Sequence, residues 1–595
     1  MNLDLQLREE VQKAAAHLFG QAPDGLQIQP TNQEFEGSHT LVCFPLTRLS
    51  RKSPEETARL VGEHLQEHSS LVNRFNVVKG FLNLVHHDHV WVSLFSSIAN
   101  RSDFGQLPSN GEEVMIEYSS PNTNKPLHLG HLRNNFLGWS VSEIFKANGY
   151  TVHKVQIIND RGIHICKSMA AWKLYGDGET PDTTMIKGDH LVGKYYVEFD
   201  KAYKAQVKAL VEKGMSQEEA EKEAPVMKYA QELLRKWEQK DPETVELWRM
   251  MNEWVYAGFA ETYKRMGVDF DKLYYESDTY LLGKEEVTKG LEKGVFYKKE
   301  DGSVWVDLTA EGLDHKVLLR ADGTSVYMTQ DIGTAILRFR DFPRIKGQVY
   351  TVGNEQEYHF KVLFLILGKL GYDWAQRCYH LSYGMVDLPS GKMKSREGTV
   401  VDADDLMAEM HSEAEKQTRE LGKLDDMTGD EARRLFEMIG MGALKFFLLK
   451  VDPKKRMLFD PNESIQLQGF TGPFIQYTHA RIRAIMRKAT EAGISWSRDS
   501  FHTVSQLEAA ERDGVFLLSR YESKLAEAVK EYSPAVVANY AYELAKSYNQ
   551  FYQSIPIFAE SDRDKLAFRI AFTEAVGNVL KKAMALLGIE VPERM

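Results

Sequence analysis

The sequence predicts a multidomain α/β protein whose core is a doubly wound parallel sheet, and three observations lead to this prediction. The chain has 595 residues, more than one hydrophobic core usually supports. Strand-like and helical segments alternate between residues 114 and 385, as they do in sheets built from βαβ units. Residues 461–595 carry helical periodicity alone, which predicts an all-α C-terminal domain.

Composition narrows the class of protein further. A hydrophobic fraction of 43% and a charged fraction of 27% are typical of globular proteins and exclude a disordered, collagen-like or disulfide-rich chain. The cysteines Cys43, Cys166 and Cys378 lack the spacing of a zinc site, so we expect buried thiols and no structural zinc. Neither a signal-type segment nor an apolar run of membrane length occurs, which favours a cytoplasmic protein.

Net charge argues weakly against a nucleic-acid partner. The formal charge is -11, whereas a nucleic-acid backbone is bound mainly by Lys and Arg. Residues 445–456 and 481–488 are nevertheless basic islands within this acidic chain. Such islands are more often solvated helix faces than binding sites, so charge alone leaves both interpretations open.

The N-terminal region reads as a small α/β domain covering residues 1–108. Helices are expected at 5–19 and 54–67, with strand-like stretches at 40–46 and 81–85. The segment 101–113 is rich in Gly, Pro, Ser, Asn and Asp, a composition typical of linkers. A domain boundary is therefore predicted there.

The central region, 109–460, opens with a βαβ unit. A strand at 114–118 precedes a helix that begins near His128, and Asn148-Gly149 ends this helix before a strand at 151–158. The charged segment 177–282 reads as a helical insertion. Helices are expected at 332–340 and 358–370, and the remaining strands of the parallel sheet at 303–307, 316–319, 326–329, 347–352 and 378–385.

The C-terminal region, 461–595, reads as helices throughout. Ser533 is placed as an N-cap before Pro534 at the first helical position, and apolar residues then follow at helical spacing. The last helix is expected at 563–587, ending at Gly588. Periodicity alone does not indicate what this domain binds.

The first candidate site is His128-Leu129-Gly130-His131, at the hand-over from the first strand to the first long helix. In open α/β sheets this carboxyl-end crevice binds ligands. Gly130 lets a base or ribose approach the backbone, and two imidazoles one turn apart can donate hydrogen bonds to phosphate oxygens. Helix capping by surface histidines is the competing interpretation of so short a motif.

The surrounding residues make the motif specific. Residues 119–133 read Ser-Ser-Pro-Asn-Thr-Asn-Lys-Pro-Leu-His-Leu-Gly-His-Leu-Arg. This run resembles the HIGH region of class I aminoacyl-tRNA synthetases, and among them the arginyl enzymes. The resemblance implies a Rossmann-type core and an ATP site that includes Pro121, Asn122, His128, Leu129, Gly130 and His131.

A second candidate site is a basic loop at residues 391–398, which offers three cations within five residues. Such a loop can stabilise the charge that passes to pyrophosphate. Its order and separation from the first motif resemble the KMSKS loop, which assigns Lys392, Met393, Lys394 and Ser395 to ATP binding. Ser395 stands where most class I enzymes have lysine, so Lys394, Arg396 or Lys125 would supply the missing charge.

A pocket for arginine requires carboxylates, because a guanidinium is a planar cation with five donors. Tyr327 and Asp331 are spaced to share one wall near a helix start, although Asp331 as an N-cap and Tyr327 as a core residue are the plain alternatives. The resemblance to arginyl enzymes assigns arginine binding to these two residues together with Ser120, Asn122, Glu276 and Gln356.

Two further segments are candidates of lower specificity. Residues 159–162, Asn-Asp-Arg-Gly, end the second strand and serve equally well as turn formers or as an edge of the site. Residues 471–483 interleave aromatics with arginines, as suits stacking on RNA bases, and resemble the start of a DALR-type anticodon-binding domain. The resemblance thus implies tRNA contacts by Gln476, Tyr477, Arg481 and Arg483.

The function implied is an arginine–tRNA ligase that forms arginyl-adenylate and then arginyl-tRNA. Its partners would be ATP as the Mg²⁺ complex, L-arginine and tRNA(Arg), with no DNA or membrane partner, and the chain is expected to be a monomer. One alternative is a related enzyme with another substrate, against which the acids Glu276 and Asp331 argue. A second is an inactive RNA-binding paralogue, in which both ATP motifs would be free to decay.

Overall fold

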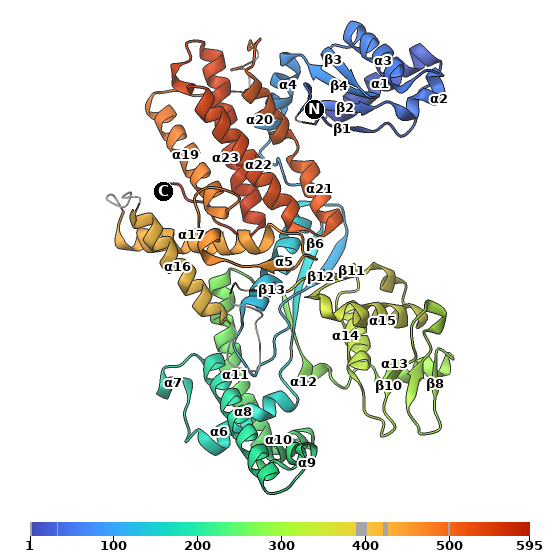
Figure 1. The fold of residues 1–595 in the computed structure, drawn as a ribbon, viewed down its shortest axis with the longest axis vertical. Coiled ribbons are helices and arrows are strands. Elements are labelled where there is room, and N and C mark those ends of the chain that lie inside the picture. Colours follow the sequence, from blue (N-terminus) through green and yellow to red (C-terminus); the bar gives the residue numbers. More distant parts are fainter. Residues whose placement is uncertain are drawn as a thin grey trace.

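The computed structural model describes residues 3–32, 34–387, 389, 401–420, 427–497, 500–501 and 503–595. Figure 1 shows a small N-terminal domain, a central sheet, two projections below the sheet and a block of C-terminal helices above it. Within the described residues, no helix combines the length and the apolar character that crossing a membrane requires.

The central sheet has five parallel strands in the order β12-β11-β5-β6-β7. Because β5 comes first in the chain but lies in the middle, the connections reverse direction between β5 and β11. Ligands bind at the carboxyl ends of strands beside such a reversal. The predicted doubly wound core is confirmed, with strands at β5 (Glu113–Glu117), β6 (Thr151–Ile158), β7 (Lys272–Tyr275), β11 (Ile345–Gly353) and β12 (Cys378–Tyr383).

Helix α5 (Leu129–Ala147) joins β5 to β6 and packs closely on the sheet. Gly138 allows this contact, because a Cβ at that position would lie 2.3 Å from the Cβ of Tyr118. The helix ends at Asn148, and Gly149 follows with φ 84°, as its left-handed position requires. Local sequence therefore fixes both the length of α5 and its distance from β5.

Three of the predicted strands do not belong to the parallel sheet. β9 (Val304–Val306) and β10 (Lys316–Leu319) join β8 (Phe296–Lys298) in a separate antiparallel sheet. Residues 326–329 begin α14 (Tyr327–Asp341), since Met328, Ile332 and Ala335 are buried at helical spacing. The edge strand next to β6 is β7, which lies near the end of the charged segment 177–282 that was interpreted as a helical insertion.

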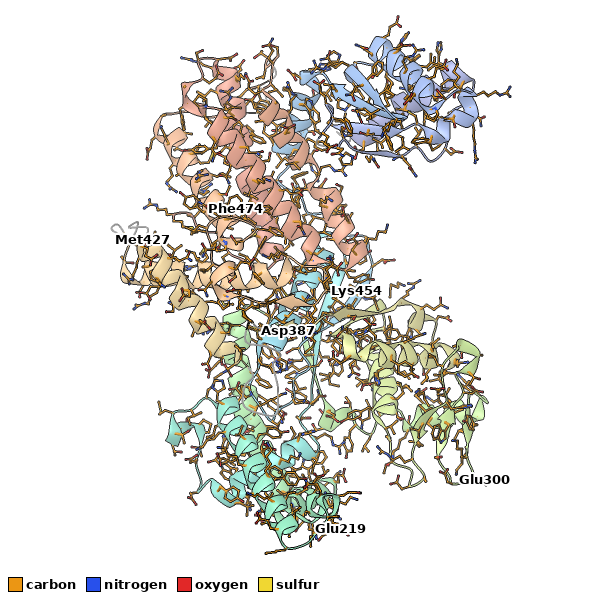
Figure 2. All side chains as sticks on the ribbon, in the orientation of Figure 1. Glu219, Glu300, Asp387, Met427, Lys454 and Phe474 are labelled. Carbon is orange, nitrogen blue, oxygen red and sulfur yellow. The ribbon has the colours of Figure 1, made fainter. Side chains whose placement is uncertain are left out.

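The first projection is the helical insertion, and Glu219 marks its far end in Figure 2. Its long helices α8 and α11 pack side by side and are joined by shorter ones. Asp241 caps α11 by accepting the Thr244 N–H, and Pro242 starts the helix. The insertion contains α6 (Ile163–Tyr175), α7 (Pro181–Thr184), α8 (Gly188–Glu212), α9 (Gln217–Glu223), α10 (Pro225–Glu238) and α11 (Pro242–Met266).

The second projection ends near Glu300 and carries the antiparallel sheet (Figure 2). It has its own apolar cluster, in which Phe296 and Val306 of the sheet meet Ile332 of α14 and Leu363 of α15. Three helices belong to this part: α13 (Lys284–Glu292), α14 and α15 (Glu357–Lys369). The short helix α12 (Glu276–Thr279) leads into it directly from β7.

The N-terminal domain is a four-stranded antiparallel sheet in the order β1-β2-β4-β3 with helices on it. Its apolar cluster, which includes Leu41 and Leu84, is separate from the core of the remaining chain. Leu3 of α1 and the apolar residues of α4 belong instead to the large core cluster, and α4 packs against C-terminal helices. The elements are α1 (Leu3–Phe19), β1 (Ile28–Pro30), β2 (His39–Val42), α2 (Thr47–Ser50), α3 (Pro54–His68), β3 (Val72–Val78), β4 (Phe81–His86) and α4 (Asp88–Ala99).

The C-terminal region is helical, as predicted, and shares one large apolar cluster with α5 and α4. Pro534 starts α22 as expected, but the Ser533 side chain makes no capping hydrogen bond. Two helices end the central region, α16 (Ala403–Glu420) and α17 (Gly429–Leu449). The helices of the C-terminal region are α18 (Pro461–Ser464), α19 (Gly472–Glu491), α20 (Ala509–Ser519), α21 (Tyr521–Glu531), α22 (Pro534–Ser554) and α23 (Arg563–Leu586).

A short parallel pair of strands, β13 (Val386–Asp387) and β14 (Met457–Leu458), joins the sheet region to these helices. Asp387 of this pair lies near the middle of the molecule in Figure 2 and forms an ion pair with Arg456. The connection between the central sheet and the C-terminal helices therefore lies beside the carboxyl ends of the central strands.

Candidate active site

The two histidines of the first motif form a capping box at the start of α5. The Nδ1 atom of His128 accepts the Gly130 N–H at 3.2 Å, and the Nδ1 atom of His131 accepts the His128 N–H at 3.1 Å. Because both Nδ1 atoms are acceptors, each neutral ring carries its proton on Nε2. Capping and ligand binding are therefore compatible here: one nitrogen of each ring serves the helix and the other remains a donor.

Both imidazoles are neutral at physiological pH. Burial and the nearby charge of Lys125 lower the pKa of His128 to about 4, and burial lowers the pKa of His131 well below its usual range. Burial also lowers the pKa of Lys125. The site thus presents neutral N–H donors and the helix N-terminus of α5, an arrangement that favours phosphate oxygens.

A strained turn separates β5 from this helix. Ser119 and Ser120 both have left-handed backbones, with φ 81° and 46°, which serines rarely adopt. The Ser119 N–H donates to Asn134 Oδ1 at 2.6 Å, and the Ser120 hydroxyl donates to Glu117 Oε1 at 3.1 Å. Surrounding side chains therefore hold the turn that leads to the predicted substrate contacts.

The predicted residues Pro121 and Asn122 follow the turn and pair with the end of β6. Asn122 is exposed and forms a parallel bridge with Asn159, whose N–H donates to the Pro121 carbonyl at 2.9 Å. Leu129 is fully buried, so its side chain belongs to the core, and only its backbone faces the site. The structure thus places Pro121 and Asn122 at the carboxyl end of β6.

The second motif lies outside the described residues, and this applies to Lys392, Met393, Lys394, Ser395 and Arg396. The chain is described again from Val401, and its first residues there contact the first motif. The Leu129 N–H donates to the Val401 carbonyl at 3.1 Å, and the Ala403 N–H donates to the Leu127 carbonyl at 3.0 Å. The chain that leaves the basic loop is thus hydrogen-bonded to both sides of His128.

Arg133, a residue that the sequence interpretation did not single out, holds the chain on the other side of that loop. Its buried guanidinium donates to the carbonyls of Gly384, at 2.6 Å, and of Pro453 and Lys455. Its place in the motif, one turn after Gly130, is the sequence signal that could have indicated a positioning role.

Tyr327 and Asp331 lie four residues apart on α14, which places them on one face of the helix. Both plain alternatives are wrong. Val326, rather than Asp331, is the N-cap residue, and the Tyr327 side chain is 75% exposed instead of buried in the core. Asp331 accepts a hydrogen bond from His359 Nε2 at 2.6 Å, a partner that the sequence did not suggest.

Glu276 begins α12 at the carboxyl end of β7, near Asp331. Burial raises the pKa of Glu276 to about 7; the charge of Arg161 opposes this shift, while Asp160 and Asp331 add to it. Three carboxyl groups therefore gather at this edge of the site, an arrangement that a cationic ligand would stabilise.

Asp160 is buried at this edge and accepts several hydrogen bonds, and burial raises the pKa of its carboxyl group. Its carboxylate accepts the Ser277 N–H at 2.8 Å, the Ser277 hydroxyl at 2.7 Å and the Tyr256 hydroxyl at 2.9 Å. Arg161 stacks on Tyr280, 4.1 Å from the ring centre. Asp160 thus holds α12 in place, while Gly162, with φ 105°, precedes α6 as a turn-forming residue. The two interpretations of residues 159–162 are therefore compatible.

Gln356 lies in a short 3-10 turn after β11, at the carboxyl edge of the sheet, and is exposed. The adjacent Glu357 accepts a hydrogen bond from the Ser382 hydroxyl at 2.6 Å, which ties this turn to β12. Gln356 therefore stands at the correct edge, on the β11 side of the reversal point.

A polar cluster links the helical insertion to the start of α16. Asp189, His190 and Asp404 place ligand atoms within 4.8 Å of one another. The Lys187 ammonium lies 2.6 Å from Asp404 Oδ2 and 3.2 Å from Asp189 Oδ2, so a cation of the chain itself already neutralises the acids. We therefore interpret the cluster as a structural link.

The predicted tRNA contacts on α19 divide into two groups. Arg481 stacks between Tyr477 and Tyr552, 5.0 and 5.1 Å from their ring centres, and Arg483 forms an ion pair with Glu593. Gln476 is fully buried and donates to the carbonyls of Met438 and Glu590. Its amide serves the packing of the chain end, which leaves no exposed surface for RNA.

Comparison with known proteins agrees with this geometry. Residues 94–460 match the family "tRNA synthetases class I (R), catalytic domain", and residues 475–595 match the "DALR anticodon binding domain". The curated arginine–tRNA ligase of Bacteroides thetaiotaomicron is 56% identical over 100% of both chains, and that of Porphyromonas gingivalis is 54% identical over the same share.

Solved structures extend the similarity to the fold. The arginyl-tRNA synthetase of Thermus thermophilus superposes with a TM-score of 0.77 at 23% identity, covering 100% of both chains, and that of Plasmodium falciparum with a TM-score of 0.76 at 18% identity, covering 99% of both. A family match over more than half of the chain, together with relatives above 50% identity along its whole length, shows that the chain belongs to the class I arginyl-tRNA synthetases.

Proposed function

We propose that this chain activates L-arginine with ATP and transfers the arginyl group to the 3′-terminal adenosine of tRNA(Arg). The observation that carries the proposal is the gathering of Glu276, Asp331 and Asp160 at the carboxyl edge of the sheet, the edge at which β5 also leads to the neutral imidazole pair of α5. A cationic side chain and a triphosphate each find the complementary chemistry within one crevice.

Arginine would bind across the crevice in one orientation. Its guanidinium would meet Asp331, Tyr327 and Glu276, with Gln356 lining the pocket. Its amino and carboxylate end would reach Ser120 and Asn122 on the turn after β5. A forked donor facing carboxylates discriminates strongly, because an uncharged isostere would leave these carboxylates without a charged partner.

ATP would bind at the N-terminus of α5. Gly130 removes the side chain that would block the backbone, and Pro121, Asn122 and Leu129 contribute main-chain surface. The Nε2–H groups of His128 and His131 would donate to phosphate oxygens. Mg²⁺ would arrive as part of the MgATP substrate, and Lys125 with the loop cations Lys392, Lys394 and Arg396 would add positive charge.

In the first step, an arginine carboxylate oxygen attacks the α-phosphorus of ATP. A new phosphorus–oxygen bond forms, the bond to the bridging oxygen breaks, and pyrophosphate leaves with the negative charge. The imidazole donors stabilise this developing charge, and positioning with electrostatics is sufficient for such a transfer. A ribose hydroxyl of the tRNA then attacks the adenylate carbonyl, which releases AMP.

The C-terminal helices would hold the tRNA. The stacked pair Tyr477–Arg481 on α19 and the neighbouring Arg483 offer aromatic and cationic surface of the kind that binds unpaired bases. We expect a cytoplasmic monomer that binds no DNA.

The test is attachment of each of the twenty amino acids, supplied separately, to unfractionated tRNA with MgATP. Attachment of arginine alone is expected. D331N should then raise the KM for arginine on the order of a hundredfold through loss of a charge-assisted contact, whereas D322N, which removes a carboxylate from the exposed turn before α14, should leave it unchanged. Attachment of another amino acid, or of none, would contradict the proposal.

A further inference from the structure

Helix α14 carries a buried cation behind the candidate arginine contacts. Tyr327 and Asp331 lie near its N-terminal end, and Arg338 lies seven residues after Asp331, on nearly the same face. Arg338 is only 1% exposed. A fully buried arginine is rare unless it is paired.

The partner of Arg338 is Glu117, the last residue of β5, which is itself 5% exposed. The guanidinium also lies over two aromatic rings of the sheet, 5.2 Å from the centre of Tyr274 on β7 and 5.8 Å from that of Tyr350 on β11. One side chain of α14 thus contacts β5, β7 and β11. The planar guanidinium can make these contacts only in one position of the helix.

Glu117 connects Arg338 to the strained turn formed by Ser119 and Ser120. One of its oxygens pairs with Arg338, and the other accepts the Ser120 hydroxyl at 3.1 Å. Ser120 is the first of the residues assigned to the amino and carboxylate end of the substrate. A continuous chain of contacts therefore runs from α14, which carries Asp331, through Arg338 and Glu117 to Ser120.

We propose that Arg338 is a positioning residue that sets the separation between the two ends of the arginine pocket. The substrate must be held at its guanidinium and at its carboxylate for the carboxylate to reach the α-phosphorus in line. The ion pair between Arg338 and Glu117 fixes α14 relative to the Ser119-Ser120 turn. The distance between the two ends of the arginine pocket therefore stays constant. This inference rests on the proposed function and assigns a residue outside the substrate contacts.

The main test compares steady-state aminoacylation by the wild type and by R338K, which keeps the charge but loses the planar guanidinium that pairs with Glu117 and lies over Tyr274 and Tyr350. We expect the KM for arginine to rise on the order of tenfold to a hundredfold, as small misplacements of a bound substrate do, while the KM for ATP and for tRNA changes less than about twofold. An unchanged KM for arginine in a folded R338K protein would overturn the proposal.

A second variant separates the loss of the ion pair from a loss of stability. In E117M/R338M both charges are replaced by apolar side chains of similar length, which buried pairs often tolerate without loss of stability. The same rise in the KM for arginine is expected at an unchanged midpoint of thermal unfolding. A stable double variant that binds arginine normally would refute the role of the pair.

The matched control lies on the same helix. Asp341, at the C-terminal end of α14, accepts hydrogen bonds from Lys272 at 2.6 Å and from the Tyr274 hydroxyl at 3.0 Å, so its contacts are to β7 rather than to the Ser119-Ser120 turn. D341N should lower the unfolding midpoint without changing the KM for arginine. An equal rise in that KM for D341N would show that general loosening of α14, rather than the link to Ser120, is responsible.

A double-mutant cycle tests the path through Glu117. If the path is real, R338K and S120A should be non-additive in the KM for arginine; strict additivity would contradict it. A wild-type chain that attaches no arginine at all would contradict the proposed function itself. Normal charging by the wild type with unaffected variants would contradict only the role of Arg338.

Discussion

At the scale of single residues, the imidazole pair caps α5 through one nitrogen of each ring and leaves the other nitrogen for the proposed phosphate contacts. His128 and His131 direct Nδ1 to backbone N–H groups, so each Nε2–H remains a donor toward the crevice. The lowered pKa values keep both rings neutral at the pH where ATP is bound. The capping alternative considered for the short motif is therefore correct as structure but incomplete as an account of these residues.

The two roles of His128 can be separated by substitution. An asparagine at this position can still accept the Gly130 N–H, so H128N should retain the stability of α5, whereas H128A should lose ~1 kcal/mol of unfolding free energy. Both variants lack the distal N–H, and we expect kcat to fall on the order of a hundredfold or more. Urea denaturation and steady-state charging measure the two effects, and near-normal kcat in H128N would contradict phosphate binding by the ring.

If Glu276 contacts the substrate as proposed, we predict that arginine binding depends on pH. Its pKa in the folded chain, about 7, is above the ordinary value of 4.5, so the folded state holds this proton more tightly than the unfolded state. The protonated Glu276 therefore adds to the free energy of unfolding. This contribution is fully present below pH 4.5 and is lost as the pH rises through 7. The KM for arginine should instead fall over the same rise, because the guanidinium binds the ionised carboxylate.

Measurements between pH 6 and pH 8 check both parts of this prediction. In the wild type, the KM for arginine should fall with rising pH, and the unfolding midpoint of the arginine-free protein should decline. E276Q lacks the titrating group and should show a higher, pH-independent KM and a flatter stability profile. The same pH dependence of the KM in E276Q would assign the effect to another group.

At the scale of elements, a backbone contact sets the distance between α14 and the loop after α12. A Cβ on Gly333 would lie 2.4 Å from the Gly283 nitrogen, and one on Gly283 would lie 1.9 Å from the Thr329 carbonyl oxygen. Gly283 also has φ 94°, which favours glycine. The two glycines thus allow α14, with Asp331, to lie directly beside the segment that follows Glu276.

G333A should force these two segments apart. Overpacking of this kind costs about 1–3 kcal/mol of unfolding free energy, and the wider pocket should raise the KM for arginine. G368A is the matched control, because that glycine lies in the neighbouring helix α15 and a Cβ there would meet nothing within 4 Å. It should stabilise the chain by about 0.5–1 kcal/mol at an unchanged KM. Chemical denaturation and charging assays compare the pair.

At the scale of the whole molecule, the N-terminal domain folds around its own apolar cluster but is fastened to the C-terminal helices. Asp88 pairs with Arg512 at 3.0 Å, and Asp4 pairs with Arg520 at 3.0 Å. Helix α4 goes further, since the Phe95 ring lies 5.0 Å from that of Phe568 within the large shared core. The domain boundary predicted at residue 108 therefore separates α4, which precedes it in sequence, from the C-terminal helices against which α4 packs.

Two truncated chains test whether α4 contributes to the large shared core rather than to the core of the N-terminal domain. A chain that begins at residue 87 keeps α4 and should unfold within a few degrees of the full chain, because the lost cluster is largely separate. A chain that begins at residue 109 loses Trp91 and Phe95 from the core and should unfold much earlier, since removal of one buried aromatic side chain costs about 3–5 kcal/mol. Equal midpoints for the two truncations would contradict this assignment of α4.

Features encoded within a few residues were predictable from sequence. The stop of α5 at Asn148-Gly149, the strands at 114–118 and 151–158, and the helical C-terminal region all depend on local periodicity and turn chemistry. The motif at His128 is local too, because its strand, turn and helix are consecutive. The sequence interpretation failed where short strands had to be assigned to a sheet: β9 and β10 formed a second sheet, and β7 was hidden in a helical segment.

By itself, the sequence determined the class of the core, the helical C-terminal region and the presence of imidazoles and carboxylates suited to phosphate and guanidinium. Tertiary structure alone decided that Arg338 pairs with Glu117, that Gln476 is buried against Met438 and Glu590, and that Glu276 lies beside Asp331. Local propensities act over one or two turns of chain, whereas these contacts join residues distant in sequence. They form only once the packing of every intervening element has fixed their positions.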